Sequence, residues 1–318
     1  MQSMIQQIMS GHAASLGEGS FGKVFKLGSY VVKRIDIADS NDMADYKNER
    51  RIWRTLSAYG PLRPYMPVYC GSTHIDVDIA GQPIARAFIF QRYEPVRNLL
   101  SRLGEWSTHP LDAGDGLQLF NALVSGFNIF HNAGYIHRDI KPANILIRDS
   151  DLSPIIVDFG LTCKVGECDS DVVGTMSYIP QNLIRKNDED RVDVREEFPI
   201  GPGQGMTLVG RRRNPRRGAR PSPTVHVKLT DKVALPTYNR ASDRYSLSLV
   251  LKQLIDVIDW AEYGEWKQEC EDIIRRYRAG VLPFLAASLV EKAEGGRRTR
   301  RRRATRKGRS RRNSRQSN

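Results

Sequence analysis

The chain has 318 residues, 40% of them hydrophobic, which is enough for one two-lobed catalytic unit or for two small domains. No apolar run approaches the roughly 18 residues that span a membrane, and the N-terminus lacks the basic start and continuous apolar core of a secretory signal. The net charge of +13 is concentrated, because residues 297–318 carry twelve Lys and Arg without an acid and residues 211–220 carry six Arg. We therefore expect an intracellular globular protein with two basic appendages and no membrane contact.

The cysteines and histidines indicate neither a disulfide framework nor a metal cluster. The chain contains no CxxC pair, and its six histidines are scattered. We therefore expect free thiols in a reducing compartment. The four cysteines are Cys70, Cys163, Cys168 and Cys270.

The first part of the chain combines a short helix with a glycine-rich hairpin. Apolar residues in segment 1–12 predict a short helix that packs on whatever part of the chain follows it. The glycine spacing of the GEGSFG run at 17–22 is shared with dinucleotide-binding folds, but those folds continue into a helix. Here the residues on either side of Gly28-Ser29 predict two strands joined by a tight turn. Such a hairpin can close on phosphates within reach of Lys33, and the alternative is a surface hairpin with a solvated lysine.

Residues 41–57 have the spacing of an amphipathic helix. The apolar residues that fall near one side are Met43, Tyr46, Ile52 and Leu56. Glu49 is the candidate partner that holds Lys33 in place. Because basic residues flank it, the alternative is a solvated surface charge.

The middle of the chain carries the most specific pattern. Strands are expected around 67–70 and 85–90, and the 3-4-3-4 apolar spacing over 113–133 predicts a helix. That helix leads to HRDIKPAN at 137–144, which is followed by short apolar strands at 145–147 and 155–157 and by Asp158-Phe159-Gly160.

HRDIKPAN places a carboxylate, an ammonium and a carboxamide within six residues. Asp139 can deprotonate a hydroxyl, Lys141 can neutralise a phosphate and Asn144 can hold a metal ion. With Asp158-Phe159-Gly160 downstream, the sequence resembles the eukaryotic-type protein kinases, on the Ser/Thr side of that family. The resemblance implies an α+β, two-lobed fold with a small β-rich N-lobe and a mainly helical, abbreviated C-lobe.

The resemblance also implies a role for each motif residue. Lys33, held by Glu49, would grip the α- and β-phosphates of ATP. Asn144 and Asp158 would hold Mg²⁺, with Mn²⁺ as an alternative, while Asp139 orients the substrate hydroxyl and Lys141 meets the charge on the γ-phosphate. The residues expected to cover the nucleotide are Leu16, Gly17, Gly19, Gly22 and Val24.

Two further segments match the family. FQRYEPVRNLL at 90–100 is similar to the hinge of the PIM kinases, which implies that Phe90 guards the back of the nucleotide pocket and that Gln91 to Tyr93 offer backbone groups to adenine. Gly174-Thr175 matches the substrate-pocket segment, in which the Thr hydroxyl bonds to the catalytic Asp and Lys. The structural anchors that the resemblance implies are His137, Arg138 and Asp243.

The end of that segment departs from the family pattern. The expected Ala-Pro-Glu reads Pro180-Gln181-Asn182, and the arginine that usually pairs with the missing acid is not evident late in the chain. Losing both halves of a buried ion pair costs less than losing one. We interpret this departure as a trimmed fold rather than a broken one.

The resulting domain organisation has four parts. They are an N-terminal segment at 1–12, an N-lobe at 13–92, a C-lobe at 93–295 with a basic loop insertion at about 183–236, and a disordered Arg-rich tail at 296–318. Within the C-lobe we expect helices over 242–258, 266–277 and 282–293. This compact form resembles kinases of large DNA viruses, which would make the protein virion-associated if it is viral.

Arginine at the density of the tail binds phosphate backbones without reading sequence, and it also serves as a nuclear import signal. Nucleic acid, through residues 297–318, and protein substrates are thus the expected partners, while the oligomeric state stays open. The substrates could be basic, or the tail itself at Thr305, Ser310 and Ser314, which lie after basic stretches.

Two other functions compete with a Ser/Thr protein kinase. An aminoglycoside-type small-molecule kinase shares the Asp and Asn of the catalytic loop. The features that argue against it are Arg138, the Lys141-Pro142 pair, Asp158-Phe159-Gly160 and the segment from Gly174-Thr175 to Tyr178. A catalytically idle kinase-fold scaffold that binds nucleic acid usually loses the equivalent of Lys33, Asp139 or Asp158, and all three are present here.

Overall fold

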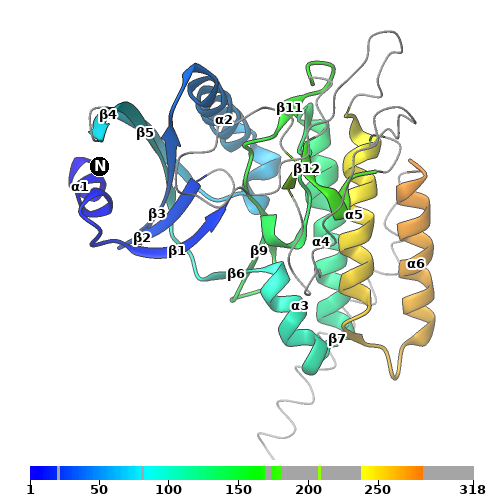
Figure 1. The fold of residues 1–318 in the computed structure, drawn as a ribbon. Helices are drawn as coiled ribbons and strands as arrows, with labels where there is room; N and C mark the ends of the chain where they lie inside the picture. The colour runs from blue at the N-terminus through cyan, green and yellow to red at the C-terminus, as the bar shows by residue number, and fades with distance from the viewer. Residues whose placement is uncertain are drawn as a thin grey trace, which may run out of the picture.

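The computed structural model describes residues 1–19, 22–79, 82–168, 173–180, 183, 207–208 and 238–281. Within these residues, a five-stranded sheet with two helices forms one lobe, and four helices with several short strands form the other (Figure 1). This is the α+β, two-lobed architecture expected from the sequence. The tail, the helix predicted over 282–293 and nearly all of the insertion lie outside the described residues.

The N-terminal lobe is built on an antiparallel sheet with the strand order β1-β2-β3-β5-β4. Its strands are β1 (Ala14–Gly19), β2 (Gly22–Leu27), β3 (Tyr30–Ile37), β4 (Tyr69–Ile79) and β5 (Gln82–Arg92). Gly28 turns the β2–β3 hairpin with a φ of 56°, as the two-residue turn requires. The last two strands are longer than predicted, because they pair as one hairpin out to Ile79 and Gln82.

The two faces of this sheet bury different partners. Helix α1 (Gln2–Met9) places Ile5 and Ile8 against Phe88 and Phe90 of β5 on one face. Helix α2 (Ser40–Ala58) covers the other face, where Ile89 joins the main core. Helix α2 also buries the apolar side that its spacing predicted, and the 3-10 turn η1 (Gly60–Tyr65) comes directly after it.

The C-terminal lobe consists of α3 (Leu99–Thr108), α4 (Ala113–Asn132), α5 (Arg240–Ile255) and α6 (Gly264–Arg278). Helix α4 buries the apolar face that its spacing predicted. Helix α5 begins at a capping box formed by Asn239 and Ser242. It ends before the predicted residue 258, because Ile258 enters strand β14 (Ile258–Asp259), which pairs with β7 (Leu111–Asp112).

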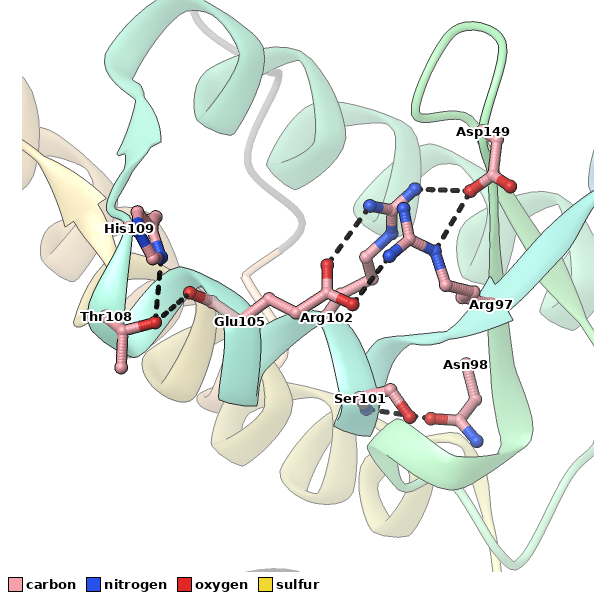
Figure 2. A network of polar contacts seen from close by, with 8 residues as sticks. All are labelled: Arg97, Asn98, Ser101, Arg102, Glu105, Thr108, His109 and Asp149. Atoms are coloured by element: carbon pink, nitrogen blue, oxygen red, sulfur yellow. Dashed lines mark hydrogen bonds and ion pairs between the residues drawn. The ribbon is translucent and has the colours of Figure 1, made fainter.

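Helix α3 has no counterpart among the predicted elements, and polar contacts hold it in place (Figure 2). The Asn98 side chain caps it by accepting a hydrogen bond from the Ser101 amide at 2.8 Å. Arg97 contacts Glu105 on the helix at 2.6 Å and Asp149 at 3.2 Å, and Arg102 contacts the same two carboxylates. These contacts join Arg97, which lies shortly after the end of β5, to the C-terminal lobe.

Short strands position the loops between the lobes. Strand β9 (Ile145–Arg148) lies between β10 (Pro154–Ile156) and β6 (Val96–Asn98), and β8 (Tyr135–Ile136) pairs with β11 (Cys163–Lys164). Strand β12 (Gly174–Thr175) pairs with β13 (Thr207–Leu208). The remaining 3-10 turns are η2 (Pro142–Asn144) and η3 (Met176–Tyr178).

The prediction of four free thiols is wrong for two of them. Cys163 and Cys168 form a disulfide, whereas Cys70 is half-buried and Cys270 is buried as free cysteines. The pair was missed because its spacing matches no known motif, and the positive φ of Gly166, at 82°, turns the chain back between the two residues. Among the described residues, no helix is long and apolar enough to cross a membrane.

Candidate active site

Lys33, Glu49 and Asp158 meet between the sheet and α2. The Lys33 Nζ donates to Glu49 Oε1 at 2.7 Å and to Asp158 Oδ1 at 2.9 Å. Glu49 is only 3% exposed, so it is not the solvated surface charge that its basic neighbours suggested. Strand β3, helix α2 and the loop after β10 thus converge on one ammonium group.

Burial and ion pairing shift the pKa values of this group in opposite directions. Burial alone would lower the pKa of Lys33, but the carboxylates of Asp158 and Glu49 outweigh it and raise that pKa above its usual value. Burial would likewise raise the pKa of Asp158, and the nearby Lys33 charge outweighs it, so the pKa of Asp158 is lowered. Lys33 therefore stays protonated and Asp158 ionised at neutral pH.

The opposite face of α2 is basic. Lys47, Arg50, Arg51 and Arg54, together with Thr55, line an open cavity of about 450 Å³ on that face. Glu49 points away from them, because a residue within one or two positions along a helix faces a different side. The cavity is therefore separate from the Lys33 site.

Polar side chains of the loop at 137–144, which we call the catalytic loop, converge on the Asp139 carboxylate together with Thr175. Lys141 Nζ lies 2.8 Å from Oδ2, and the Asn144 amide donates to the same oxygen at 2.8 Å. The Thr175 hydroxyl donates to Oδ1 at 2.7 Å and accepts from Lys141 Nζ at 2.7 Å. The hydrogen bonds expected of Thr175 with Asp139 and Lys141 are therefore present.

Asp243 anchors the backbone of this loop from α5. It is 1% exposed, and it accepts hydrogen bonds from the His137 amide at 2.7 Å, the Arg138 amide at 3.0 Å and the His131 Nε2 at 2.9 Å. Arg138 has a φ of 68°, a conformation that non-glycine residues rarely adopt, and its bond to Asp243 helps to hold it there. The His137 side chain contacts the Val157 carbonyl at 3.0 Å, which ties the loop to the segment before Asp158.

Gly174 must be glycine for the Thr175 segment to lie against the catalytic loop. Its φ is 108°, and a Cβ atom added there would stand 2.4 Å from the Arg138 carbonyl oxygen. Tyr238 holds the preceding residue, because its hydroxyl bonds to both the amide and the carbonyl of Val173. Tyr238 was missed, since a lone tyrosine 65 residues further along the chain gives no local signal.

Hydrogen bonds from α5 stand in for the acid that the Pro180-Gln181-Asn182 segment lacks. The Ser246 hydroxyl donates to the Tyr178 carbonyl at 2.7 Å, and the Tyr178 hydroxyl pairs with the Gln253 side chain. This anchoring agrees with a trimmed fold, although Gln181 and Asn182 themselves lie outside the described residues.

The glycine-rich hairpin has the geometry of a phosphate cover. Gly22 has a φ of 136°, and a Cβ atom there would stand 2.2 Å from the Arg34 carbonyl oxygen, so the sheet itself requires this glycine. A Cβ atom on Gly17 would meet nothing within 4 Å, so packing does not require that one. Leu16 is 53% exposed beside it. Bare backbone and an exposed apolar side chain suit a phosphate and a flat ring.

The prediction for Phe90 is wrong. Phe90 packs against α1 on the outer face of the sheet, whereas Ile89, which pairs directly with Lys33 across the strands, shares the Lys33 face. A shift of one residue along a strand moves a side chain to the other face, so alignment of the hinge alone did not settle the register. The pairing of β3 with β5 shows that Ile89, and not Phe90, lies on the same face of the sheet as Lys33.

Two of the backbone groups that Gln91 to Tyr93 were predicted to offer to adenine already have partners. The Arg92 amide donates to the Val68 carbonyl and the Tyr93 amide to the Ser29 carbonyl, each at 2.9 Å. These two N–H groups are therefore already used within the N-terminal lobe. Any contact of these two residues to a base would therefore have to use other groups.

The oxygen atoms of Asn144 and Asp158 fit a magnesium ion. The Asn144 amide nitrogen donates to the Asp139 carboxylate and carbonyl, which directs its hydrogens toward Asp139 and leaves its side-chain oxygen out of both bonds. The Val157 amide donates to the Asn144 carbonyl at 3.2 Å, which places Asn144 next to the residue that precedes Asp158. Mg²⁺ binds through one or two such oxygens together with substrate phosphates.

Comparison with known proteins agrees with this two-lobed kinase fold. A family model described as the protein kinase domain matches residues 12–194, more than half of the chain. The chain therefore belongs to the protein kinase family. The match ends before α5, which carries Asp243.

Curated relatives are named serine/threonine or calcium-dependent protein kinases. Calcium-dependent protein kinase 5 of Oryza sativa subsp. japonica is 38% identical over 192 residues, which are 56% of this chain and 32% of the relative. A probable serine/threonine-protein kinase of Encephalitozoon cuniculi is 36% identical over 87 residues, 27% of this chain and 16% of the relative. These matches thus span about a third or less of each relative's length.

Proposed function

We propose that the protein is a serine/threonine kinase that transfers the γ-phosphate of ATP to hydroxyl groups of protein substrates. The observation that carries the proposal is the set of contacts from Lys141, Thr175 and Asn144 to the buried Asp139 carboxylate. Phosphoryl transfer requires little covalent chemistry from the protein, so positioning and charge neutralisation supply most of its rate. A carboxylate held from three sides is suited to that task.

Each residue has a distinct role in this reaction. Asp139 accepts the proton of the substrate hydroxyl as its oxygen attacks the γ-phosphorus. Lys141, which already bridges Asp139 and Thr175, neutralises charge on the transferred group. Lys33, fixed by Glu49, binds the α- and β-phosphates.

Asn144 and Asp158 would hold the metal ion. Mg²⁺, or Mn²⁺ in its place, supplies positive charge to the phosphates when it is bound. Because Lys33 holds one Asp158 oxygen at 2.9 Å, the ion pair also fixes the direction in which the carboxylate faces.

Transfer of labelled γ-phosphate from ATP to an arranged peptide library tests the proposal. We expect label on Ser and Thr peptides and none on a panel of small alcohols such as aminoglycosides. Label on the small alcohols alone would favour a small-molecule kinase. No transfer to either, with nucleic-acid binding retained, would favour a catalytically idle scaffold.

Replacing Thr175 by Val should lower kcat/KM for the peptide about 10- to 100-fold, because it removes the hydroxyl between Asp139 and Lys141 and leaves buried polar atoms without a partner. The KM for ATP should change less than about twofold, since Thr175 does not contact the Lys33 group. Thr175→Ser keeps the hydroxyl and serves as the matched control. A Val variant as active as the Ser variant would contradict the role.

We also propose that residues 297–318 bind nucleic acid, since twelve basic residues without an acid release counterions from a phosphate backbone. Deleting this segment should weaken DNA binding and flatten the slope of log affinity against log salt by several units. A chain that ends at 296 is compared with the full chain on one duplex between low and moderate salt. An unchanged slope would contradict the proposal.

The same tail would direct nuclear import and offer Thr305, Ser310 and Ser314 for self-phosphorylation. Protein substrates, basic or self, are the proposed partners, and a virion location applies only if the protein is viral. Mass spectrometry of the tail after incubation with ATP, and imaging of a tagged chain with and without the tail, test these two statements.

A further inference from the structure

The disulfide between Cys163 and Cys168 lies in the segment that runs from Asp158 to Thr175. Cys163 belongs to β11, where it pairs with Ile136 directly before the catalytic loop. Cys163 is 8% exposed, whereas Cys168 is half-buried at the surface. A reagent in solution therefore reaches the sulfur of Cys168 more easily than that of Cys163.

The turn between the two cysteines does not depend on the disulfide. Its backbone is held by the Val165 amide, which donates to the Gly134 carbonyl at 2.8 Å, and by the Glu167 amide, which donates to the Lys164 carbonyl at 2.9 Å. Lys164 and Glu167 also form an ion pair at 3.1 Å. A crosslink across so short a loop removes little chain entropy, so it contributes less to stability than one that closes a long loop. Its reduction should leave the fold intact.

The disulfide joins a member of a small apolar cluster, which we call the loop cluster, to a residue at its edge. Its members are Ile136, Leu161, Cys163, Val173, Ile179, Leu183 and Tyr238. Cys168 and Met176 are partly buried and pack against this cluster. Since Met176 directly follows Thr175, the loop cluster contacts both Cys168 and the neighbour of the residue bonded to Asp139.

Two anchors therefore bound a short span of chain. Cys168 is tied to β11 by the disulfide, and Val173 is tied to Tyr238 by hydrogen bonds. Four residues separate these anchors, and Thr175 lies two residues beyond the second. Cys168 and Thr175 are therefore seven residues apart along the chain, and Val173 is anchored between them.

We infer that Cys163 and Cys168 are a thiol–disulfide exchange site that controls the binding of the protein substrate. The disulfide form holds Thr175 against Asp139, as in this structure, and the dithiol form releases Cys168 from the loop cluster and loosens the Thr175 segment. The inference rests on the proposed kinase function. A disulfide in a reducing compartment is usually transient or redox-sensing, so the inference fits the intracellular location expected from the sequence.

The exchange takes two low-molecular-weight thiols. The thiolate of the first attacks the Cys168 sulfur, the bond to Cys163 breaks, and its electron pair leaves on the Cys163 sulfur, which takes up a proton. The second thiol attacks the resulting mixed disulfide and releases Cys168 as a thiol. In the reverse direction, a low-molecular-weight disulfide is reduced to two thiols as the protein disulfide forms.

The effect should divide between the two substrates. The group of Lys33, Glu49 and Asp158 is held by ion pairs outside the loop cluster, so reduction should leave the KM for ATP within about twofold. For the peptide, kcat/KM should fall about three- to tenfold, because the competent arrangement becomes one of several.

The test uses the full chain in two parts. First, maleimide labelling with and without a phosphine reductant maps the thiols, and we expect Cys163 and Cys168 to label only after reduction. Second, peptide phosphorylation is measured in dithiothreitol and after reoxidation with glutathione disulfide. The Cys168→Ser variant should have the reduced rate in both buffers, and Cys70→Ser, which leaves the pair intact, should respond like the unaltered protein.

Each outcome decides something. Labelling of both cysteines before reduction, in protein exposed to glutathione disulfide, would overturn the exchange site. Equal peptide rates in the two buffers, or a Cys168→Ser variant that still responds, would overturn control of the substrate while the kinase function stands. Absence of transfer in every state would overturn the proposed function and the control together, and the labelling would still decide the disulfide separately.

Discussion

Replacing Asp139 by Asn will lower kcat for peptide phosphorylation about a thousandfold, because a carboxamide cannot accept the proton of the substrate hydroxyl. The Asn side chain has nearly the same shape, so the variant should fold. The KM for ATP should stay within about twofold, since Asp139 does not contact the Lys33 group. Initial rates with labelled ATP and a saturating peptide measure the effect.

The matched control is Asp76→Asn, which makes the same chemical change on an exposed residue of β4. Its rate should equal that of the unaltered protein. An Asp139→Asn variant that keeps its rate would refute the assignment of Asp139, whereas loss of activity in both variants would point to a preparation fault and require a new one. Unfolding temperatures of the two variants exclude a general loss of structure.

Replacing Asp243 by Ala will destabilise the fold by about 3 to 5 kcal/mol, because the His137, Arg138 and His131 donors lose a shared buried acceptor. Burial alone would raise the pKa of Asp243, but the hydrogen bond and charge of His131 outweigh it and lower that pKa. A carboxylate with a lowered pKa stabilises the fold above about pH 4 and loses that effect as the pH falls through its folded-state pKa. The difference between the variant and the unaltered protein should therefore shrink in acid.

Urea unfolding of both proteins at neutral pH and below pH 4 measures this difference. Asp256→Ala, at the exposed C-terminal end of the same helix, is the control and should change the free energy of unfolding by less than about 0.5 kcal/mol. A neutral-pH loss for Asp243→Ala as small as that of the control would show that the loop does not depend on this anchor.

The local motifs determined much of the site from the sequence. HRDIKPAN holds Asp139, Lys141 and Asn144 within six residues, so their proximity is a property of the chain itself. The Lys33–Glu49 pair was also predicted, because a lysine on a strand followed by a glutamate on the next helix matches the order found in the protein kinase family. The residues on either side of Gly28-Ser29 likewise predicted β2 and β3, and helical apolar spacing predicted α2 and α4, although the strand ends and helix α3 were not predicted.

Only the tertiary structure decided the face of each strand and the long-range supports. It placed Ile89 rather than Phe90 on the Lys33 face, because a register shift of one residue reverses every side chain. It also brought Tyr238 to Val173 and joined Cys163 to Cys168 through a turn that the sequence did not signal. The sequence by itself thus determined the proximity of the candidate groups Asp139, Lys141 and Asn144, since they are close along the chain. The folded structure decided what holds them, because those contacts join residues that are far apart or depend on one turn.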